Sequence, residues 1–531
     1  MTGTRGADQG PGRIRALLIG LLLVAFGLRV WGLSYGLPFA SSFTSDAERF
    51  VRDAVWIAVT RNWNPGWFGH PGSTVIYPLA IVFGATNVLD RCAGSAHGYV
   101  LQSFQGDPSP YYLVGRGFAV LVSVLSIAAT YAMARRVGDA RTGLFAASML
   151  AFSPVHWGLS ALARTDAPVV LFTALSLLAA LSTLHNPGWS RFALAGSAAG
   201  LAMSSKYYGI IALAGLPLAQ LLGREGRVGR RWREVPPSWW GKLLLGLTCA
   251  GVAFAATSPF VLLDAQTAWQ SIAQEQQGGR LGADGLPPWG NLWWYLTTAL
   301  PRALGWPVAA LFVLGVWQAL RHRRGGALVL LGFAGVFTLL VSLQALDWDR
   351  WLAPILPGVC AVAALGLQWG AGAVYALLAR RVSRQAVSLL LLCVALVGPM
   401  ARCVEGAIER TLPDTRLLTR AWIQEHLPAG ATLATEAYTA PLDGTPLQVM
   451  EVGVLAEHSL DFYCQSSVQY VGTSDAMYNR YAAEPERYAE QLLFYRRLRE
   501  SAELVHRESP VCWRVAGPTV SIYRLVGCDT E

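Results

Sequence analysis

Long apolar runs recur along most of this chain, and they constrain its fold more than any other feature. A membrane-spanning helix needs about 20 predominantly apolar residues, and about eleven segments approach or reach that length. They cover residues 14–33, 112–134, 143–160, 167–184, 191–205, 207–222, 239–263, 303–320, 326–345, 351–378 and 385–401. A helix satisfies its own backbone hydrogen bonds inside lipid. The sequence therefore predicts a mainly α fold, a polytopic membrane helix bundle with about eleven spans.

The composition supports a membrane protein and excludes several other classes. Charged residues make up 14% of the 531 residues and apolar residues 53%, whereas soluble domains carry about 25% charged residues. Disordered, collagen-like, coiled-coil and small disulfide-rich chains are excluded by the same numbers. The formal charge is +9, but the basic residues stand in short clusters between apolar runs. We therefore expect no nucleic-acid partner.

The arginine clusters predict how the helices cross the membrane, because short loops rich in Lys and Arg stay in the cytoplasm. The clusters are Arg13 and Arg15; Arg135, Arg136 and Arg141; Arg224, Arg227, Arg230, Arg231 and Arg233; Arg321, Arg323 and Arg324; and Arg380, Arg381 and Arg384. A cytoplasmic N-terminus places every cluster on the cytoplasmic side. The apolar stretch 73–90 would reverse this pattern if it were a span, so we expect a short or re-entrant helix within one large outer loop, 34–111. Arg29 in the first helix indicates a retained anchor.

The chain changes character after about residue 401, where charges rise and apolar runs shorten. We expect a transmembrane domain over 1–401 and an extracytoplasmic domain over 402–531. Helical spacing over 415–427 and 485–499, with strand-like runs over 468–471 and 520–526, predicts a small α/β domain. Cys464, Cys512 and Cys528 lie in it, and the spacing leaves open whether one disulfide forms there.

The first outer loop contains acids and a histidine suited to chemistry at a membrane surface. Asp46 opens an amphipathic helix, where a carboxylate is able to act as a general base for an acceptor hydroxyl. Ser45 and Glu48 also have the spacing of a capping box, which is a purely structural alternative. His70 follows in a Pro- and Gly-rich turn and is a candidate for holding an anionic lipid headgroup, or simply a hydrogen-bonded interfacial imidazole.

A second group of candidates stands at the outer ends of later spans. Asp166 begins the fourth span, where a helix cap is the structural alternative, and Arg164 beside it is a possible phosphate partner. Lys206, followed by Tyr207, is one of two lysines in the chain. It is expected either to bind a donor phosphate or to snorkel to the interface. Arg116, at the start of a span, has the same two interpretations.

The order of these features resembles the bacterial membrane glycosyltransferases of the protein O-mannosyltransferase and aminoarabinose-transferase group, which have the GT-C fold (glycosyltransferase family 39-like). The resemblance rests on Thr44–Val51, Trp67–Gly72, Ala163–Asp166, Ser204–Lys206 and Arg350–Pro354. It aligns Asp46 with the catalytic acid of the group and Asp166 with its second-loop acid. The group often has Glu directly after the catalytic Asp, whereas Ala47 follows Asp46 here and Glu48 is displaced by one residue.

The resemblance implies transfer of a hexosyl or pentosyl group from a polyprenyl-phosphate donor to a hydroxyl on the outer side of a bacterial cytoplasmic membrane. In this interpretation Asp46 and Asp166 are catalytic. The substrate-binding set is Glu48, His70, Arg116, Arg164, Lys206 and Tyr207. The acceptor is left open among protein, lipid and glycan, and a divalent metal is neither required nor excluded. The alternative is a transporter or flippase for a lipid-linked sugar, although no paired halves are visible.

Overall fold

The computed structural model describes residues 11–43, 45–92, 99–222, 236–276, 281, 284–378 and 381–526. The chain divides into two units by its internal contacts. The first contains Met1–Leu33, Arg49–Gln277 and Gly285–Glu405, and the second contains Ser34–Glu48, Gly278–Asp284 and Gly406–Glu531. The predicted basic loop with Arg224, Arg227, Arg230, Arg231 and Arg233 lies outside the described residues, as do Arg380 and Cys528.

Helices account for the regular structure of the first unit. Along the chain they are α1 (Pro11–Val30), α3 (Ser45–Thr60), α4 (Ser73–Cys92), α5 (Tyr99–Gly106), α6 (Ser109–Val137), α7 (Ala140–Ala151), α8 (Pro154–Ser160), α9 (Asp166–Ser182), α10 (Trp189–Ser205), η1 (Tyr207–Ala214) and α11 (Gly215–Leu222). They continue with α12 (Pro237–Thr257), α13 (Pro259–Leu263), α14 (Ala265–Gln276), α15 (Pro288–Trp294), η3 (Tyr295–Ala299), α16 (Leu300–Leu304), α17 (Trp306–Arg321), α18 (Gly325–Ser342), η4 (Asp349–Ile355), α19 (Leu356–Leu377) and α20 (Arg384–Glu409).

Each of the eleven predicted apolar segments contains helix, but several are broken where local chemistry interrupts the helix. The segment 143–160 divides between α7 and α8, because Ser153 caps α8 through His156 N and Pro154 begins it. The segment 303–320 begins later than predicted, at Trp306, because Gly305 has φ +82° and separates α16 from α17.

Five helices within the described residues are long and apolar enough to cross a membrane. They are Ser109–Val137, Pro237–Thr257, Gly325–Ser342, Asp349–Leu377 and Arg384–Glu409. A sixth candidate is the pair Pro288–Leu304 and Trp306–Arg321, which is bent by 119°. Shorter apolar helices include Ser73–Thr86, Asp166–Ser182 and Tyr207–Leu222. The membrane bundle is therefore present, while the number of eleven spans stays a prediction.

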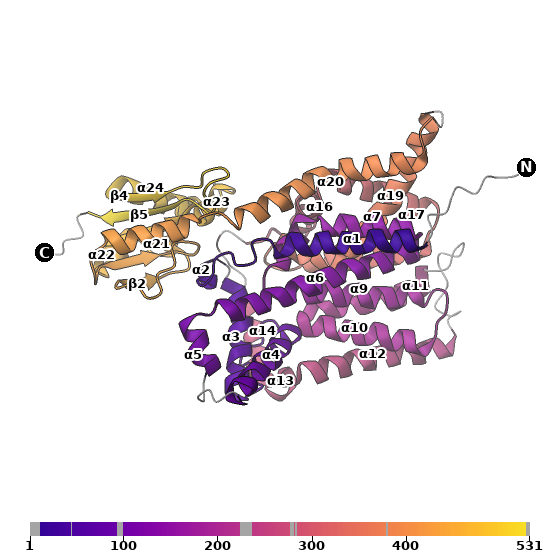
Figure 1. Ribbon diagram of the computed structural model, residues 1–531, viewed down its shortest axis with the longest axis horizontal. Helices are drawn as coiled ribbons and strands as arrows, with labels where there is room; N and C mark the ends of the chain where they lie inside the picture. The colour runs from indigo at the N-terminus through magenta and orange to yellow at the C-terminus, as the bar shows by residue number, and fades with distance from the viewer. Residues whose placement is uncertain are drawn as a thin grey trace, which may run out of the picture. The chain divides into compact units, whose positions relative to one another are not determined.

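Small residues allow neighbouring helices of the bundle to approach closely. α1, α6, α9, α10 and α12 lie one beside the next (Figure 1). A Cβ at Gly196 of α10 would lie 1.9 Å from the carbonyl oxygen of Gly246 in α12, and one at Gly200 would lie 2.3 Å from that of Ala250. This spacing of small residues every fourth position is typical of packed membrane helices.

The arginine-bearing connections gather at one end of this unit. Gly326 at the start of α18 lies against Val137 at the end of α6. Gln368 of α19 donates to Asp139, which caps α7, and Arg384 at the start of α20 donates to the Gln368 carbonyl. These contacts bring the ends of α6, α18, α19 and α20 together, which is the arrangement expected if the predicted cytoplasmic loops share one face.

The second unit is the small α/β domain predicted from the sequence. Its elements are α2 (Ala40–Phe43), α21 (Thr415–His426), β1 (Thr432–Thr435), β2 (Gln448–Glu451), η5 (Leu455–Glu457), α22 (Leu460–Gln465), β3 (Tyr470–Ser474), α23 (Asp475–Ala482), α24 (Ala489–Ser501), β4 (Ala502–Glu508) and β5 (Val520–Leu525). The strand order is β2-β1-β3-β5-β4. β1 is parallel to β2 and β3, whereas β5 is antiparallel to β3 and β4.

Four of these elements confirm predicted segments: α21, α24, β3 and β5. The sequence interpretation did not identify β1, β2 and β4. The burial pattern of β2 runs exposed, exposed, intermediate, exposed, so this edge strand lacks the alternation that identifies a half-buried strand. Cys464 is disulfide-bonded, whereas Cys512 is a free and exposed thiol.

The chain segment after α1 packs against this α/β domain within the second unit. Tyr35 donates to Asp414 Oδ2 at 3.0 Å. The Arg416 guanidinium donates to both Asp414 oxygens and to the Tyr35 hydroxyl, and its centre lies 3.7 Å from the ring centroid of Phe43. Asp414 and Arg416 are both buried. A buried, charge-assisted network therefore fixes this segment on the domain.

Candidate active site

Asp166 is the first residue of α9, and its carboxylate is almost completely buried. Its exposed fraction is 1%. The N-cap is Thr165, which makes no side-chain capping hydrogen bond. Instead of capping the helix, Asp166 directs Oδ1 to Lys206 Nζ at 2.6 Å, and its Oδ2 lies 3.4 Å from Arg164 Nε. Helix capping is therefore not the role of this side chain.

Lys206 stands in the break between α10 and the 3₁₀-helix η1. Its backbone is extended, with φ −144° and ψ 138°, so the chain leaves the helix at this residue. Its side chain is 3% exposed and its ammonium is paired with Asp166. A snorkelling lysine would extend its ammonium to the surface. The structure does not support that alternative for Lys206.

Arg350 is a further cation at this site; the sequence interpretation noted it in the Arg350–Pro354 motif but assigned it no role in the site. It is the second residue of η4, which directly precedes α19, and its guanidinium centre lies 4.7 Å from the ring centroid of Trp348. It interacts electrostatically with both Asp166 and Lys206. The sequence signal for Arg350 was its position beside Asp349 between two tryptophans, Trp348 and Trp351, just before an apolar helix.

Three cations therefore surround one buried carboxylate. Arg164 and Lys206 contact the Asp166 carboxylate, and Arg350 interacts with it electrostatically. Guanidinium and ammonium groups gathered in this way bind phosphate through charge-assisted hydrogen bonds. The cluster therefore has the electrostatic character of an anion-binding site.

The turn with His70 packs beside Lys206 through backbone and side-chain hydrogen bonds. The Tyr207 hydroxyl donates to the Phe68 carbonyl at 2.8 Å, and Gly72 N donates to the Ser205 carbonyl at 3.4 Å. Thr74 and Ser205 share a hydroxyl hydrogen bond of 2.8 Å. The residues on both sides of Lys206 thus fix the 67–72 turn.

Within that turn, His70 faces an acid rather than the cation cluster. Its Nε2 lies 3.7 Å from Glu275 Oε1, and its ring meets Trp67 edge-on with centroids 5.9 Å apart. Arg49 of α3 places its guanidinium centre 4.0 Å from the Trp67 ring centroid. His70 is therefore brought into the neighbourhood of the site by the turn, with Glu275 as its charged contact.

Arg116 is buried but is engaged with the backbone. It donates to the Leu33 carbonyl at 2.6 Å. A Cβ added at its neighbour Gly115 would lie 2.9 Å from Ala163 Cβ, so α6 runs closely past the segment that leads to Arg164. The structure thus brings Asp166, Arg164 and Lys206 into direct contact, but it does not show Arg116 in contact with them.

The predicted catalytic residue Asp46 and its neighbour Glu48 lie in the first turn of α3, which confirms the expected helix. Their side chains lie outside the described residues, and so does the side chain of Ser45. A third acid on the same helix, Asp53, was not among the predicted site residues. Asp53 is partly buried 3.9 Å from Arg49 Nε, and burial raises its pKa to about 6.

No group of three or more His, Cys, Asp or Glu side chains in the described part of the chain is placed to hold a metal ion. The residues in contact at the site are one carboxylate and several cations. A hard divalent cation prefers several oxygen ligands. This donor set fits an anion better than a divalent cation.

Comparisons with known proteins agree with this architecture. Residues 112–261 match the family model PMT_2, described as dolichyl-phosphate-mannose-protein mannosyltransferase. This segment contains Arg116, Arg164, Asp166, Lys206 and Tyr207. No curated protein matches the chain as a whole or in part at a significant level.

Two crystal structures of ArnT from Cupriavidus metallidurans share the fold. The structure bound to undecaprenyl phosphate has 15% sequence identity and a TM-score of 0.55, with 98% of this chain and 100% of that chain covered. The apo structure has 15% identity and a TM-score of 0.56, with 97% and 98% covered. The chain is therefore a multi-pass membrane protein with the GT-C fold of ArnT, as its sequence predicted, and it carries a segment that matches the dolichyl-phosphate-mannose-protein mannosyltransferase family.

Proposed function

We propose that this protein is an integral membrane glycosyltransferase. It moves a sugar from a polyprenyl-phosphate donor to a hydroxyl acceptor on the outer side of a bacterial cytoplasmic membrane. The observation that carries the proposal is the cluster of Arg164, Lys206 and Arg350 around the buried Asp166 carboxylate. The family match and the ArnT fold point in the same direction, since one of those ArnT structures is bound to undecaprenyl phosphate.

This group of three cations suits the phosphate of the donor. In the ground state the phosphate bears one sugar ester and one lipid ester, and it gains a further negative charge when the sugar leaves. Fixed cations in a water-poor site stabilise that developing charge without reorganisation. Lys206 and Arg350 are the cations proposed to contact the phosphate, with Arg164 beside them. Arg116 and His70 stay proposed substrate-binding residues, with His70 lying against Glu275.

Asp166 has a positioning role in this proposal. Its Oδ1 accepts a hydrogen bond from Lys206, and its Oδ2 faces Arg164. A carboxylate held in this way is a poor proton acceptor, because protonation would break a buried ion pair. It holds the cations at the spacing that the phosphate needs and contributes to orienting the sugar or acceptor.

Asp46 is the proposed general base. An acceptor oxygen attacks the anomeric carbon of the sugar, its proton passes to the Asp46 carboxylate, and the bond between the anomeric carbon and the phosphate oxygen breaks. The lipid phosphate leaves with the bonding electron pair. A single displacement of this kind inverts the anomeric configuration. Glu48 lies one residue further on and is proposed to bind substrate. Tyr207 holds the 67–72 turn through Phe68.

The remaining assignments follow from the arginine pattern and the C-terminal domain. The N-terminus is proposed to be cytoplasmic, with residues 1–401 forming the transmembrane catalytic domain and 402–531 the extracytoplasmic domain. The disulfide at Cys464 supports an oxidising compartment for that domain. The transferred sugar is a hexose or pentose, and the acceptor is a hydroxyl of a protein, lipid or glycan. Nothing in the family match or the ArnT fold favours a transporter.

The proposal is tested with Asp46→Asn in the full-length protein. Membranes that contain the wild type or the variant are compared by mass spectrometry for sugar added to proteins, lipids and glycans. The wild type should add one sugar species, and Asp46→Asn should nearly abolish it at equal protein abundance. Asp107→Asn is the matched control, because Asp107 is an exposed outer-loop acid that accepts from Ser109 N at the start of α6. Full transfer by Asp46→Asn, or translocation of an unaltered lipid-linked sugar, would contradict the proposal.

A further inference from the structure

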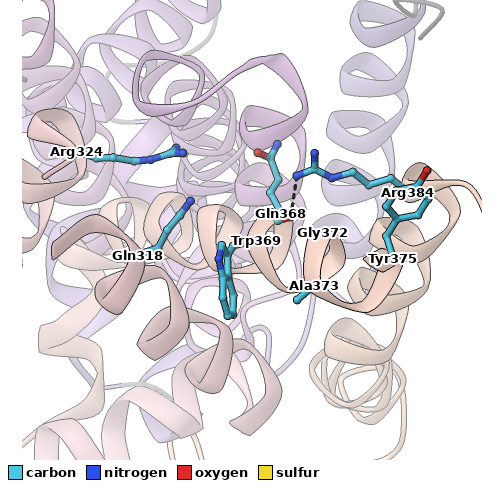
Figure 2. A pocket seen from close by; sticks show the side chains of 8 residues that line it. All are labelled: Gln318, Arg324, Gln368, Trp369, Gly372, Ala373, Tyr375 and Arg384. Atoms are coloured by element: carbon cyan, nitrogen blue, oxygen red, sulfur yellow. Dashed lines mark hydrogen bonds between the residues drawn. The ribbon is translucent and has the colours of Figure 1, made fainter. Parts of the chain in front are cut away.

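A cavity of about 330 Å³ lies at the arginine-bearing end of the first unit, among α17, α18, α19 and α20. Figure 2 shows Arg324 and Arg384 extending toward it from opposite sides, with Gln368 between them and Gln318 below Arg324. Trp369 also lines the cavity. Arg324 is the N-cap residue of α18, and Arg384 begins α20. The cavity thus collects polar side chains from four separate helices.

These polar groups have unused hydrogen-bonding capacity. Arg324 makes no side-chain hydrogen bond or ion pair with the described part of the chain. The Arg384 guanidinium makes one hydrogen bond within the described part of the chain, of 3.2 Å, to the Gln368 carbonyl. Gln318 is 7% exposed, and its Oε1 has no hydrogen-bond partner among the described residues. A buried amide oxygen without a partner is costly unless a ligand or water completes it.

The charge of the cavity selects an anion. Its lining contains two arginines and no carboxylate. Asp139 lies nearby, but its Oδ1 already accepts from Gln368, Thr142 N and the Thr142 hydroxyl. Two guanidinium groups facing one space are suited to a phosphate, because arginine binds phosphate oxygens through paired hydrogen bonds. A hydroxyl group of the ligand would donate the missing hydrogen bond to Gln318 Oε1.

The surroundings of the cavity are those of a membrane surface. Large apolar side chains near it are exposed: Leu320 is 60% exposed, Leu377 84% and Leu378 45%. Trp369 meets Trp317 edge-on with centroids 4.9 Å apart, and tryptophans gather where acyl chains meet headgroups. A lipid bound here would place its chains along the exposed leucines, whereas a free phosphate would leave them without a partner.

The cavity is distinct from the candidate active site. Arg350 precedes the N-terminus of α19, and the cavity is lined by Gln368, Trp369 and Gly372 near its C-terminus. At 1.5 Å per residue, Leu356 and Gly372 are about 24 Å apart along the helix. That distance is comparable to the thickness of a bilayer core, which is about 30 Å. The two sites therefore face opposite leaflets.

We propose that this cavity binds the phosphate headgroup of an anionic phospholipid in the leaflet opposite the candidate active site. Arg324 and Arg384 hold the phosphate oxygens, and Gln318 accepts from a headgroup hydroxyl. Basic pockets between membrane helices bind anionic headgroups by this chemistry. The site goes beyond the proposed transfer reaction and does not depend on it.

The test uses the purified full-length protein in nanodiscs of phosphatidylcholine, with and without phosphatidylglycerol. Native mass spectrometry counts the retained lipid, and thermal unfolding reports stabilisation. Phosphatidylglycerol should be retained and should raise the midpoint temperature of thermal unfolding. Inorganic phosphate added to phosphatidylcholine discs should not bind and should not shift that midpoint. Arg324→Gln and Arg384→Gln should each weaken retention by about tenfold, because each removes a charge-assisted contact. Gln318→Leu should weaken retention of phosphatidylglycerol without changing the net charge.

Arg136→Gln is the matched control, because Arg136 is exposed at the same end of the bundle and does not line the cavity. It should retain the lipid as the wild type does. Equal loss in Arg136→Gln and the cavity variants would mean a diffuse charge effect and would overturn the site. Equal retention of both lipids by the wild type, or an equal midpoint shift with inorganic phosphate, would overturn the lipid assignment. The wild-type measurements decide the lipid class even where a variant fails to fold.

Discussion

Lys206 Nζ lies 2.6 Å from Asp166 Oδ1, and the two side chains are 3% and 1% exposed. They come from the start of α9 and the break after α10, forty positions apart in the chain. The pair is the centre of the cation cluster. The sequence identified the two residues as separate candidates and did not show that they are in contact. Charge balance at this pair decides both the stability of the site and its affinity for an anion.

Lys206→Met should reduce transfer by about 100-fold or more, because it removes a fixed cation from the developing phosphate charge. It should also destabilise the protein by about 3–5 kcal/mol, since breaking one side of a buried pair leaves the other charge uncompensated. Initial rates of sugar transfer and thermal unfolding in detergent measure the two effects.

The double variant Asp166→Asn/Lys206→Met separates these effects. Removing both charges should restore part of the stability lost in Lys206→Met, because no unpaired carboxylate is left beside the missing ammonium. Transfer should stay low, since the phosphate still lacks its cation. If the double variant loses as much stability as Asp166→Asn and Lys206→Met lose together, the two side chains do not interact as described.

Arg350→Gln should weaken binding of the sugar donor without lowering the stability of the fold. Arg350 interacts electrostatically with the Asp166–Lys206 pair, and losing its charge should raise KM for the donor by about tenfold. Rates measured over a range of donor concentration distinguish KM from kcat. Arg350→Lys should recover part of the affinity because it keeps the charge. An unchanged KM in Arg350→Gln would remove this residue from the donor site.

Arg416→Met should loosen the segment that precedes α3. Arg416 joins Tyr35, Phe43 and Asp414 within one unit, and Asp46 follows this segment closely in sequence. Faster hydrogen exchange over residues 34–43, together with a lower kcat for transfer, is the expected result. Arg496→Met, on helix α24, removes a charge without touching this network and is the control. Unchanged exchange over residues 34–43 would show that the network does not hold the segment.

Glu436 should make the α/β domain less stable as pH rises. Burial raises its pKa from an ordinary 4.5 to about 7. The unfolded chain therefore ionises first, so the stabilisation is complete below about pH 4.5 and is lost as pH rises to about 7. A shift of this size corresponds to about 3 kcal/mol. Hydrogen exchange of β1 and β3, corrected for intrinsic rates, measures the change.

Glu436→Gln should flatten that pH dependence. Glu436 accepts from Ser474 N and from the Tyr495 hydroxyl, and an amide oxygen is able to keep one of these contacts without charge. Glu451→Gln, an exposed edge-strand change on β2, should leave the wild-type pH profile intact. A steep profile that persists in Glu436→Gln would assign the pH dependence to another group.

Gly196→Leu should destabilise the helix bundle by more than about 3 kcal/mol, because overpacking against backbone forces the helices apart. A Cβ at this position would meet the Gly246 carbonyl oxygen at 1.9 Å. Gly251→Leu on α12 is the control, because a Cβ there has no atom within 4 Å. Thermal unfolding in detergent compares the two. Equal midpoints would indicate that α10 and α12 separate without cost.

The helices of the bundle were predictable because each depends on a local property, a run of apolar residues. α21 was predictable from the helical spacing of its apolar residues, and β5 from its strong β-formers, with positions 520–523 buried. Interruptions inside the runs were less predictable. The break at Lys206 was predicted as the boundary between segments 191–205 and 207–222, whereas the breaks at Ser153 and Gly305 fall inside segments that the sequence interpretation treated as continuous.

The sequence by itself determined that this chain is a membrane helix bundle followed by an α/β domain, and it identified Asp166, Arg164 and Lys206 as candidates. Only the tertiary structure decided that Lys206 forms an ion pair with Asp166 and that Arg350 interacts with this pair electrostatically. It also decided that Tyr35 donates a hydrogen bond to Asp414. The physical reason is the separation along the chain of the residues that interact. Hydrophobic periodicity is encoded by adjacent residues, whereas charge pairing depends on side chains that the folded helices bring together from distant positions.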